Sequence, residues 1–186
     1  SLRAREIVQQ LLEFARKKTP DKKKFDVNSA LKEVVSVMNV QLKDKKIKMR
    51  EEYSELPLIM GDQNQLKQVF LNIINNAVDA LPGGRGEITV GTHLSESYAV
   101  IEIRDTGPGI AADVLPRIFE PFFTTKKAKG TGLGLPISYK IIQSHNGKID
   151  VKSKKGEGTV FSISLPLYSE NREQVRQFTP KLSKSY

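Results

Sequence analysis

The stretch Lys126–Ile142, KKAKGTGLGLPISYKII, carries three glycines at alternate positions directly before an apolar, helix-like pattern. Gly130, Gly132 and Gly134 lower helix propensity and cost backbone entropy, so stability does not explain their presence. Free backbone amides at a helix N-terminus attract anions, and glycines let an anion approach without side-chain collision. The stretch therefore points to a phosphate-binding loop, although taken alone it fits an ordinary flexible loop equally well.

Hydrophobic periodicity on both sides of this stretch predicts a mixture of helices and strands. Helices are expected over residues 3–17, 26–42, 62–81 and 133–144. Strands are expected over residues 47–53, 56–60, 86–94, 98–105, 147–154 and 158–167. Because helices and strands do not alternate regularly, the order favours an α+β sandwich over a doubly wound sheet.

Composition limits the classes of protein to consider. The chain has 186 residues, 38% of them hydrophobic, which is enough for one well-cored domain and a short appendage. It has no cysteine and two distant histidines, which excludes a disulfide framework and argues against a zinc site. The formal charge is +9, yet the lysines are scattered and few aromatic residues lie among them, so we expect no nucleic-acid partner. No apolar run approaches the roughly 20 residues of a membrane span.

The segment LNIINNAVDAL, residues 71–81, places two amides on one face of an amphipathic helix. Asn72 and Asn76 are four residues apart, so their side chains lie on the same side. Taken alone, such amides most often bond to neighbouring backbone. The functional alternative is that a carboxamide oxygen ligates Mg²⁺, which takes its other oxygens from water and phosphates.

Two further segments carry candidate binding groups. In IEIRDTGPGI, Asp105 ends an apolar strand before Gly107 and Gly109, and its carboxylate is suited to accept a hydrogen bond from an exocyclic amine. A plain Asp-Gly turn is the alternative. In LPRIFEPFFTTKKAKGTGLGL, three phenylalanines would anchor a loop to the core, and hydroxyls and lysines follow that would contact phosphate. These residues are Phe119, Phe122, Phe123, Thr124, Thr125, Lys126 and Lys127.

The order and spacing of these motifs resemble those of the catalytic, ATP-binding domain of two-component sensor histidine kinases, in the Bergerat-fold superfamily. NIINNA resembles the N box, DTGPGI the first glycine box, IFEPFF the F box and GTGLGL the second glycine box. GEGTVFSISLP is similar to the closing strand of that family. The resemblance covers residues 25–167 and implies a two-layer α/β sandwich, in which helices cover one face of a mixed, mainly antiparallel sheet.

The resemblance implies a role for each matching position. Asn76, assisted by Asn72, would ligate Mg²⁺ on the phosphates of ATP, and Lys126 and Lys127 would neutralise charge during catalysis. Asp105 would bind the adenine amine. The other nucleotide contacts would come from the glycine boxes, the F box, the lid and the closing strand: Gly107, Gly109, Ile110, Phe119, Thr124, Thr125, Gly130, Thr131, Gly132, Leu133, Gly134 and Thr159.

Some positions depart from the family pattern. Relatives that hydrolyse ATP carry a glutamate where this chain has Asn72, which cannot act as a base, so hydrolysis should be slow. Asp79 stands where many relatives carry a lysine, which removes one phosphate contact. Neither His93 nor His145 lies in the sequence context of a phosphoacceptor, and both are expected to be structural.

These departures imply an incomplete kinase. We expect residues 1–19 to be the remnant of a helical dimerisation and phosphoacceptor domain, 20–24 a linker, 25–168 the catalytic domain and 169–186 a basic tail. The implied partners are that dimerisation domain and a response regulator receiver domain. A cytoplasmic, monomeric piece of a homodimeric protein is expected, with no membrane contact of its own. Membrane anchoring of the longer protein is left open.

Two other functions remain open from the sequence. One keeps the fold but phosphorylates serine or threonine, as anti-sigma kinases do. The EPFFTTK segment and the N-terminal helix favour the histidine kinase over this alternative. The other is a nucleotide-regulated module that docks a partner protein and performs no chemistry.

Overall fold

The structure, a computed structural model, describes residues 20–126 and 130–168. Within these ranges a sheet is built from β2 (Lys46–Tyr53), β4 (Arg85–Ser95), β5 (Tyr98–Asp105), β6 (Lys148–Ser153) and β7 (Thr159–Pro166). The strand order is β2-β4-β5-β7-β6. β2 and β4 are parallel, and the other neighbours are antiparallel. The sheet is therefore mixed and mainly antiparallel, as the family resemblance implied.

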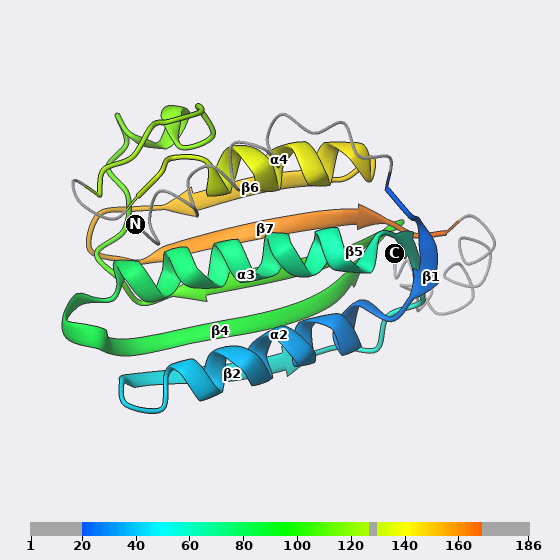
Figure 1. Cartoon of the computed structure of the whole chain (residues 1–186), viewed down its shortest axis with the longest axis horizontal. Coiled ribbons are helices and arrows are strands. Elements are labelled where there is room, and N and C mark those ends of the chain that lie inside the picture. The colour runs from blue at the N-terminus through cyan, green and yellow to red at the C-terminus, as the bar shows by residue number, and fades with distance from the viewer. Residues whose placement is uncertain (1–19, 127–129, 169–186) are drawn as a thin grey trace, which may run out of the picture.

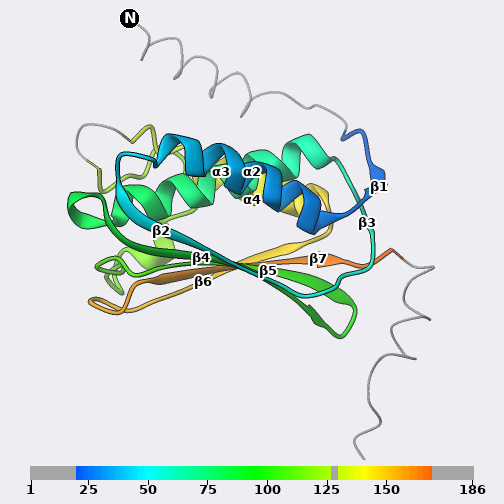
Figure 2. The same cartoon turned by 90° about the horizontal axis from the view of Figure 1, so that it is seen from below.

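Three α-helices form the second layer. They are α2 (Val27–Gln41), α3 (Gln63–Ala80) and α4 (Gly134–Ser144), and Figure 2 shows them packed side by side on one face of the sheet. Two short 3-10 helices, η1 (Pro82–Gly84) and η2 (Leu115–Arg117), lie in connections. The two-layer α+β sandwich is confirmed, and these three helices lie within one or two residues of their predicted bounds. The helix predicted over residues 3–17 lies outside the described residues.

A small second sheet includes part of the segment expected to be a linker. β1 (Lys23–Phe25) pairs antiparallel with β3 (Ile59–Gly61), so Lys23 and Lys24 are part of a strand that the sequence did not predict. Asp21, just before β1, is also bonded to the domain, because its amide donates to the Asp62 carboxylate at 3.1 Å. The pairing partner lies some 36 residues further along the chain, and a lysine-rich segment gives no periodic signal for it.

The core lies between the two layers. α3 contributes most to it, because its apolar face follows the helical period and meets the sheet. Its buried residues are Leu66, Val69, Phe70, Ile73, Ile74, Ala77 and Val78. The inward positions of β5 and β7, such as Ile101 and Ile163, are fully buried opposite them. Each fully buried large side chain contributes roughly 1.5–3 kcal/mol, so the position of α3 on the sheet is strongly determined.

The start of α3 is held by Asp62. Its carboxylate accepts hydrogen bonds from the amides of Asn64 and Gln65, both at 3.1 Å, as expected of an N-cap. In a capping box the Gln65 side chain would accept from the Asp62 amide. Here that amide donates to Nε2 of His145 at 2.9 Å. The end of α4 therefore caps the start of α3.

None of the helices in the described part of the chain combines the length and apolar character that a membrane span requires.

Candidate functional site

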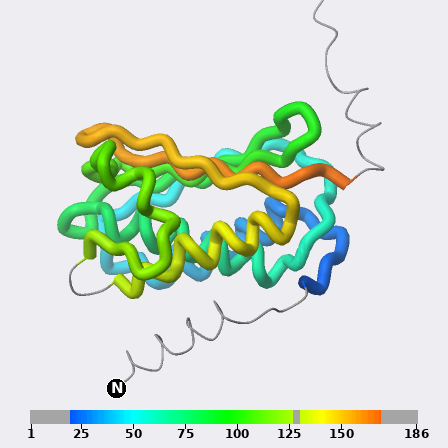
Figure 3. The backbone as a smooth tube through the Cα atoms, turned by 90° about the horizontal axis from the view of Figure 1, so that it is seen from above, coloured from blue at the N-terminus to red at the C-terminus, as the bar shows by residue number. Residues whose placement is uncertain are grey.

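The predicted site residues gather at one end of the sandwich. Figure 1 shows the C-terminal end of α3, the N-terminal end of α4 and the segment 106–126 together at the left-hand edge of the molecule. The tube in Figure 3 shows the same segment folded against the start of α4. α3 carries the two asparagines, and the strand end of β5 carries Asp105. The fold thus brings together motifs that lie far apart in the sequence, such as Asn72 and Gly134, which are 62 residues apart.

Asn76 faces a cation. Its Oδ1 accepts a hydrogen bond from Nζ of Lys126 at 3.2 Å, and the same ammonium forms an ion pair with Asp79 Oδ2 at 2.8 Å. The carboxamide oxygen is therefore turned outward from the helix towards the segment that carries the lysines. An oxygen in this position, already bonded to a positive group, has the chemistry that a magnesium ligand needs. Lys127 lies outside the described residues.

Asn72 has a different environment. Its Nδ2 donates to the carbonyl oxygen of Gly134 at 3.3 Å and lies 3.4 Å from the hydroxyl of Ser138. Ser138 is fully buried and also donates to the Gly134 carbonyl at 3.0 Å. Asn72 thus ties α3 to the first turn of α4, where the glycine loop ends, while Asn76 one helical turn later faces Lys126.

Asp105 is a buried carboxylate at the end of β5. Its side chain has little exposure, and its Oδ1 accepts from the Gly107 amide at 2.8 Å. Burial raises the pKa of Asp105 above its ordinary value of 3.8, although hydrogen bonds from the Gly107 and Thr159 amides act in the opposite direction. A buried acceptor with capacity for further hydrogen bonds is suited to bind an amine.

The loop that follows Asp105 is held against the β6–β7 turn. Gly109 has a φ of +72°, and a Cβ there would overlap the Lys154 carbonyl oxygen. The amide of Ile110 donates to the Ser153 hydroxyl at 2.8 Å. Ser153 Oγ in turn lies 3.0 Å from Oγ1 of the buried Thr159, which is paired with Asp105 across β5 and β7. Thr159 therefore lies next to Asp105 and links it to the loop that follows.

The second glycine loop makes a close backbone contact. The Phe122 amide donates to the Gly132 carbonyl at 2.9 Å, and a Cβ on Gly132 would overlap the Phe122 backbone. Gly130 is similarly close to the Thr124 side chain. Glycine is thus required here to close the loop on the F box. Gly134 is different, because its nearest neighbour is the Asn72 side chain at 3.9 Å, an ordinary contact.

The three phenylalanines have different environments. Phe119 packs against the core and lies 5.5 Å, centroid to centroid, from the ring of Tyr139 on α4. Phe122 is 62% exposed and has a φ of +66°, so its predicted role as an anchor to the core is wrong. The ring of Phe123 lies under the guanidinium of Arg117 at 4.3 Å. The loop is therefore anchored mainly through Phe119.

The polar residues on either side of the undescribed segment 127–129 make local contacts. Thr124 Oγ1 accepts from the Lys126 amide at 3.1 Å, and Thr131 Oγ1 accepts from the Leu133 amide at 3.4 Å. Thr125 is exposed and Leu133 is buried.

Both histidines lie away from the candidate site residues, and the predicted structural role is seen for His145. His93 is exposed on β4. His145 is buried; its Nδ1 donates to the Ile141 carbonyl at 2.8 Å and its Nε2 accepts from the Asp62 amide, so the ring is the neutral tautomer. Burial and the nearby Lys22 lower the pKa of His145, while the Ile141 carbonyl and Asp62 oppose the shift.

Three contributors were missed by sequence reasoning. Ser138 and Ser153 brace the two glycine loops, but a single serine in an amphipathic helix or an alternating strand gives no distinguishing signal. Asp79 was noticed only as a missing lysine. Its ion pair with Lys126 spans 47 residues, a separation that sequence periodicity does not predict.

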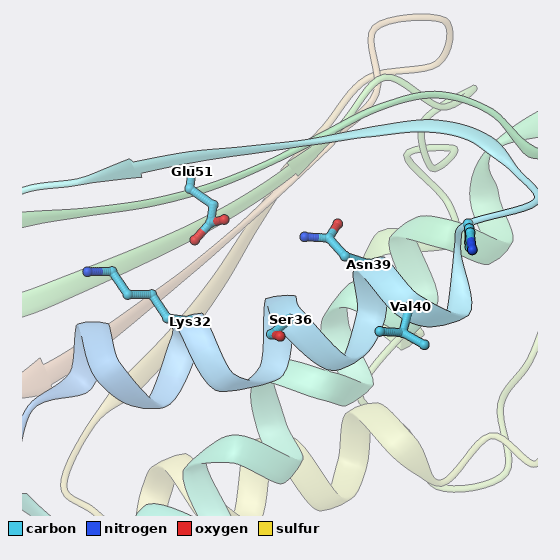
Figure 4. Close-up of a pocket in the computed structure, with 6 residues that line it drawn as sticks. Lys32, Ser36, Asn39, Val40 and Glu51 are labelled. Atoms are coloured by element: carbon cyan, nitrogen blue, oxygen red, sulfur yellow. The ribbon is translucent and has the colours of Figure 1, made fainter.

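A separate open pocket of about 620 Å³ lies between α2 and β2, and Figure 4 shows its lining residues. They are Lys32, Ser36, Asn39, Val40, Lys43 and Glu51. None of the predicted site residues is among them. Its lining residues include no glycine and none from the first turn of α2. In the part of the chain that the structure describes, no group of three or more His, Cys, Asp or Glu side chains could hold a metal ion.

Residues 61–169 match the family model described as histidine kinase-, DNA gyrase B- and HSP90-like ATPase. Sporulation kinase C of Bacillus subtilis (strain 168) is 38% identical to this chain over 167 residues, which are 89% of this chain and 39% of that protein. The chain thus spans about two fifths of that relative.

Solved structures agree with this match. The catalytic domain of the histidine kinase ThkA, without nucleotide, has 31% identity and a TM-score of 0.71, covering 78% of this chain and 97% of that one. Full-length ShkA in complex with AMPPNP has 29% identity and a TM-score of 0.78, covering 87% of this chain and 35% of that one.

Proposed function

The chain belongs to the histidine kinase-, DNA gyrase B- and HSP90-like ATPases, as a catalytic domain of the sensor histidine kinase type, and from this premise we propose its reaction. It transfers the γ-phosphate of ATP to a histidine on a helical dimerisation domain, and the phosphate then passes to an aspartate of a response regulator. Residues 25–168 form the catalytic unit, residues 1–19 belong to the dimerisation domain and residues 169–186 are a basic tail.

One observation carries the proposal. The buried acceptor Asp105 and the cation-facing oxygen of Asn76 lie at the same end of the sandwich, next to the glycine loop that starts α4. An adenine nucleotide has an exocyclic amine at one end and phosphates with their cation at the other. The site offers the complementary groups in the same order.

Asp105 supplies base selection. Its carboxylate accepts a hydrogen bond from the adenine amine, directly or through water. Guanine carries a carbonyl oxygen at the corresponding ring position, and two acceptors facing each other would repel. Gly107, Gly109, Ile110 and Thr159 shape the surrounding pocket through the loop contacts described above. Adenine nucleotides should therefore be bound in preference to guanine nucleotides.

Asn76 is the proposed protein ligand of Mg²⁺. When bound, the ion neutralises phosphate charge and orients the γ-phosphate for in-line attack. Asn72 assists indirectly, since its amide holds the start of α4 where the glycine loop meets the phosphates. Gly130, Gly132 and Gly134 present backbone amides, and Thr124, Thr125, Thr131, Leu133, Lys126 and Lys127 complete the phosphate side. Phe119 anchors this loop to the core.

The absence of a base at position 72 directs the reaction. A carboxylate one turn before Asn76 could activate water, but an amide cannot. The acceptor is then an external nucleophile with its own lone pair, and the imidazole of a histidine fulfils this requirement near neutral pH. Hydrolysis of ATP by the chain alone should be slow.

The test is phosphoryl transfer to a supplied acceptor. The chain is incubated with γ-labelled ATP, Mg²⁺ and the dimerisation domain of a related histidine kinase, with that kinase's own catalytic domain as the positive control. Acid-labile label that disappears when the acceptor histidine is replaced by glutamine is the expected result. Acid-stable label on serine would favour the anti-sigma type. Nucleotide binding without transfer to any acceptor that the positive control labels would favour the docking module.

A further inference from the structure

Lys126 donates a hydrogen bond to Asn76 Oδ1, the oxygen that is proposed to ligate magnesium. Its Nζ lies 3.2 Å from Asn76 Oδ1 and 2.8 Å from Asp79 Oδ2. Asn76 and Asp79 are three residues apart on α3, so both oxygens converge on one cation from the same helix face. The backbone of Lys126 also has a partner, because its amide donates to Thr124 Oγ1 at 3.1 Å.

This arrangement makes two cations compete for one ligand. A carboxamide oxygen that accepts from an ammonium cannot also ligate Mg²⁺ without placing two positive charges at contact distance. The lysine must therefore leave Asn76 when a magnesium nucleotide binds. Its main partner in the free protein is Asp79, which carries the opposite charge and makes the shorter contact.

We propose that Asp79 is a positioning residue that holds Lys126 on the magnesium oxygen of Asn76 while the site is free of nucleotide. Binding of a magnesium nucleotide then breaks the Asp79–Lys126 ion pair and releases the ammonium for the phosphates. The acidic residue at position 79 thus lowers the affinity of the resting protein for its nucleotide. This inference rests on the proposed assignment of Asn76 to magnesium.

The size of the effect follows from exposure. The side chains of Lys126 and Asp79 are 33% and 50% exposed, so solvent screens their attraction. Exposed ion pairs of this kind correspond to about two- to fivefold in an equilibrium constant. Asp79→Asn should therefore tighten binding of Mg-ADP by about two- to fivefold.

A simple repulsion between Asp79 and the phosphates would also tighten binding in Asp79→Asn, and a double-mutant cycle separates the two explanations. The ion pair requires Lys126, whereas repulsion of the phosphates does not. In a Lys126→Gln background, Asp79→Asn should have no further effect on the Kd for Mg-ADP. An equal gain in both backgrounds would overturn the proposal, as would a loss or no change in the single variant.

The second measurement needs no nucleotide. Brief labelling with an amine-reactive ester, read by peptide mass spectrometry, reports the accessibility of each lysine amine. Asp79→Asn should raise labelling of Lys126 by about two- to fivefold, and Asp79→Glu should restore protection. Glu33→Gln is the matched control, since it makes the same charge change at the ion pair of Glu33 with Lys67. It should raise labelling of Lys67 alone.

The two measurements distinguish the failures. If the wild-type chain binds no nucleotide, the proposed function fails, while the labelling of Lys126 still reports whether the ion pair exists. If nucleotide binds with the expected Mg²⁺ dependence but Lys126 labelling is the same in wild type and Asp79→Asn, the positioning role of Asp79 is wrong and the proposed function stands.

Discussion

At the scale of single residues, the neighbours of each polar side chain in the site determine which groups it can bind. Asn72 and Asn76 have the same side chain on the same helix face, yet one bonds to α4 and the other faces a lysine. Asp105 is buried at a strand end, and the Gly107 and Thr159 amides offset only part of the cost of burying its carboxylate. A ligand that supplies hydrogen-bond donors would compensate this cost.

Replacement of Asn76 tests its assignment to magnesium. Asn76→Ala should weaken binding of Mg-ADP by at least about tenfold, because a direct metal ligand is lost, and should abolish the difference between titrations with and without Mg²⁺. Asn75→Ala is the matched control, since Asn75 is the neighbouring asparagine and is exposed. Isothermal titration calorimetry measures both. A preserved Mg²⁺ dependence in Asn76→Ala would contradict the assignment.

The residue types and spacings of the asparagines, Asp105 and the glycines indicated a candidate site, and the fold brings these residues to one end of the sandwich. Contacts between distant side chains were not predictable. The ion pair of Asp79 with Lys126 and the bond from the Asp62 amide to His145 join residues 47 and 83 positions apart. Such contacts are decided by how elements pack, and local sequence does not encode that packing.

At the scale of elements, tight backbone contacts position the two glycine loops and the β6–β7 turn. Gly158 has a φ of +82°, and a Cβ there would overlap the carbonyl oxygen of Asp105. Gly156, in the same turn, has a φ of +86° with no atom within 4 Å of such a Cβ. The two glycines therefore share a conformational requirement but differ in packing.

This difference predicts unequal effects of alanine. Gly156→Ala should cost about 1–2 kcal/mol in the free energy of unfolding, from the left-handed backbone alone. Gly158→Ala should cost clearly more and should also reduce ADP binding, because β7 or Asp105 must shift. Denaturant unfolding and ADP titration of the two variants check this. Equal losses of stability with unchanged ADP binding would show that the close contact has no role.

Helix and strand periodicity was sufficient to predict most elements, since each buries one face and its apolar residues follow a clear period. β1 was missed because three residues rich in lysine have no such period, and pairing with β3 alone makes them a strand. The Phe122 ring was wrongly assigned to the core because the local sequence does not indicate that this residue has a positive φ and an exposed ring.

At the scale of the whole molecule, one buried imidazole joins the ends of two helices. His145 accepts from the Asp62 amide at the start of α3 and donates to the last turn of α4. Protonation would remove the acceptor for the Asp62 amide and place a charge in a buried position. The packing of α3 against α4, which also shapes the site, is therefore linked to pH.

The direction of this linkage is fixed by the lowered pKa of His145. Below its ordinary value of 6.5 the unfolded chain binds the proton and the folded protein resists it, so stability falls as the pH decreases towards the folded pKa. The slope for one proton is at most about 1.4 kcal/mol per pH unit. Thermal unfolding of wild type, His145→Gln and His93→Gln should show this slope lost only in His145→Gln. Two-dimensional NMR titration of both rings in the wild type gives an independent check, since a His145 pKa at or above 6.5 would contradict it.

The family-level architecture followed from motif order. The strand order β2-β4-β5-β7-β6 did not, since it depends on which strands pair across the sheet. The central proposal for the whole molecule is that this end of the sandwich binds an adenine nucleotide with its magnesium ion. The loops, helices and strand ends that carry the site residues come together only in the folded chain.

The measurement that tests this claim most directly is calorimetric titration of the chain with ADP, with and without Mg²⁺, alongside GDP. ADP should bind, and bind more tightly with Mg²⁺, whereas GDP should give a much weaker signal, because Asp105 selects the adenine amine and Asn76 holds the ion. Equal affinity for ADP and GDP would contradict the role of Asp105. Absence of binding by either nucleotide would contradict the central claim itself.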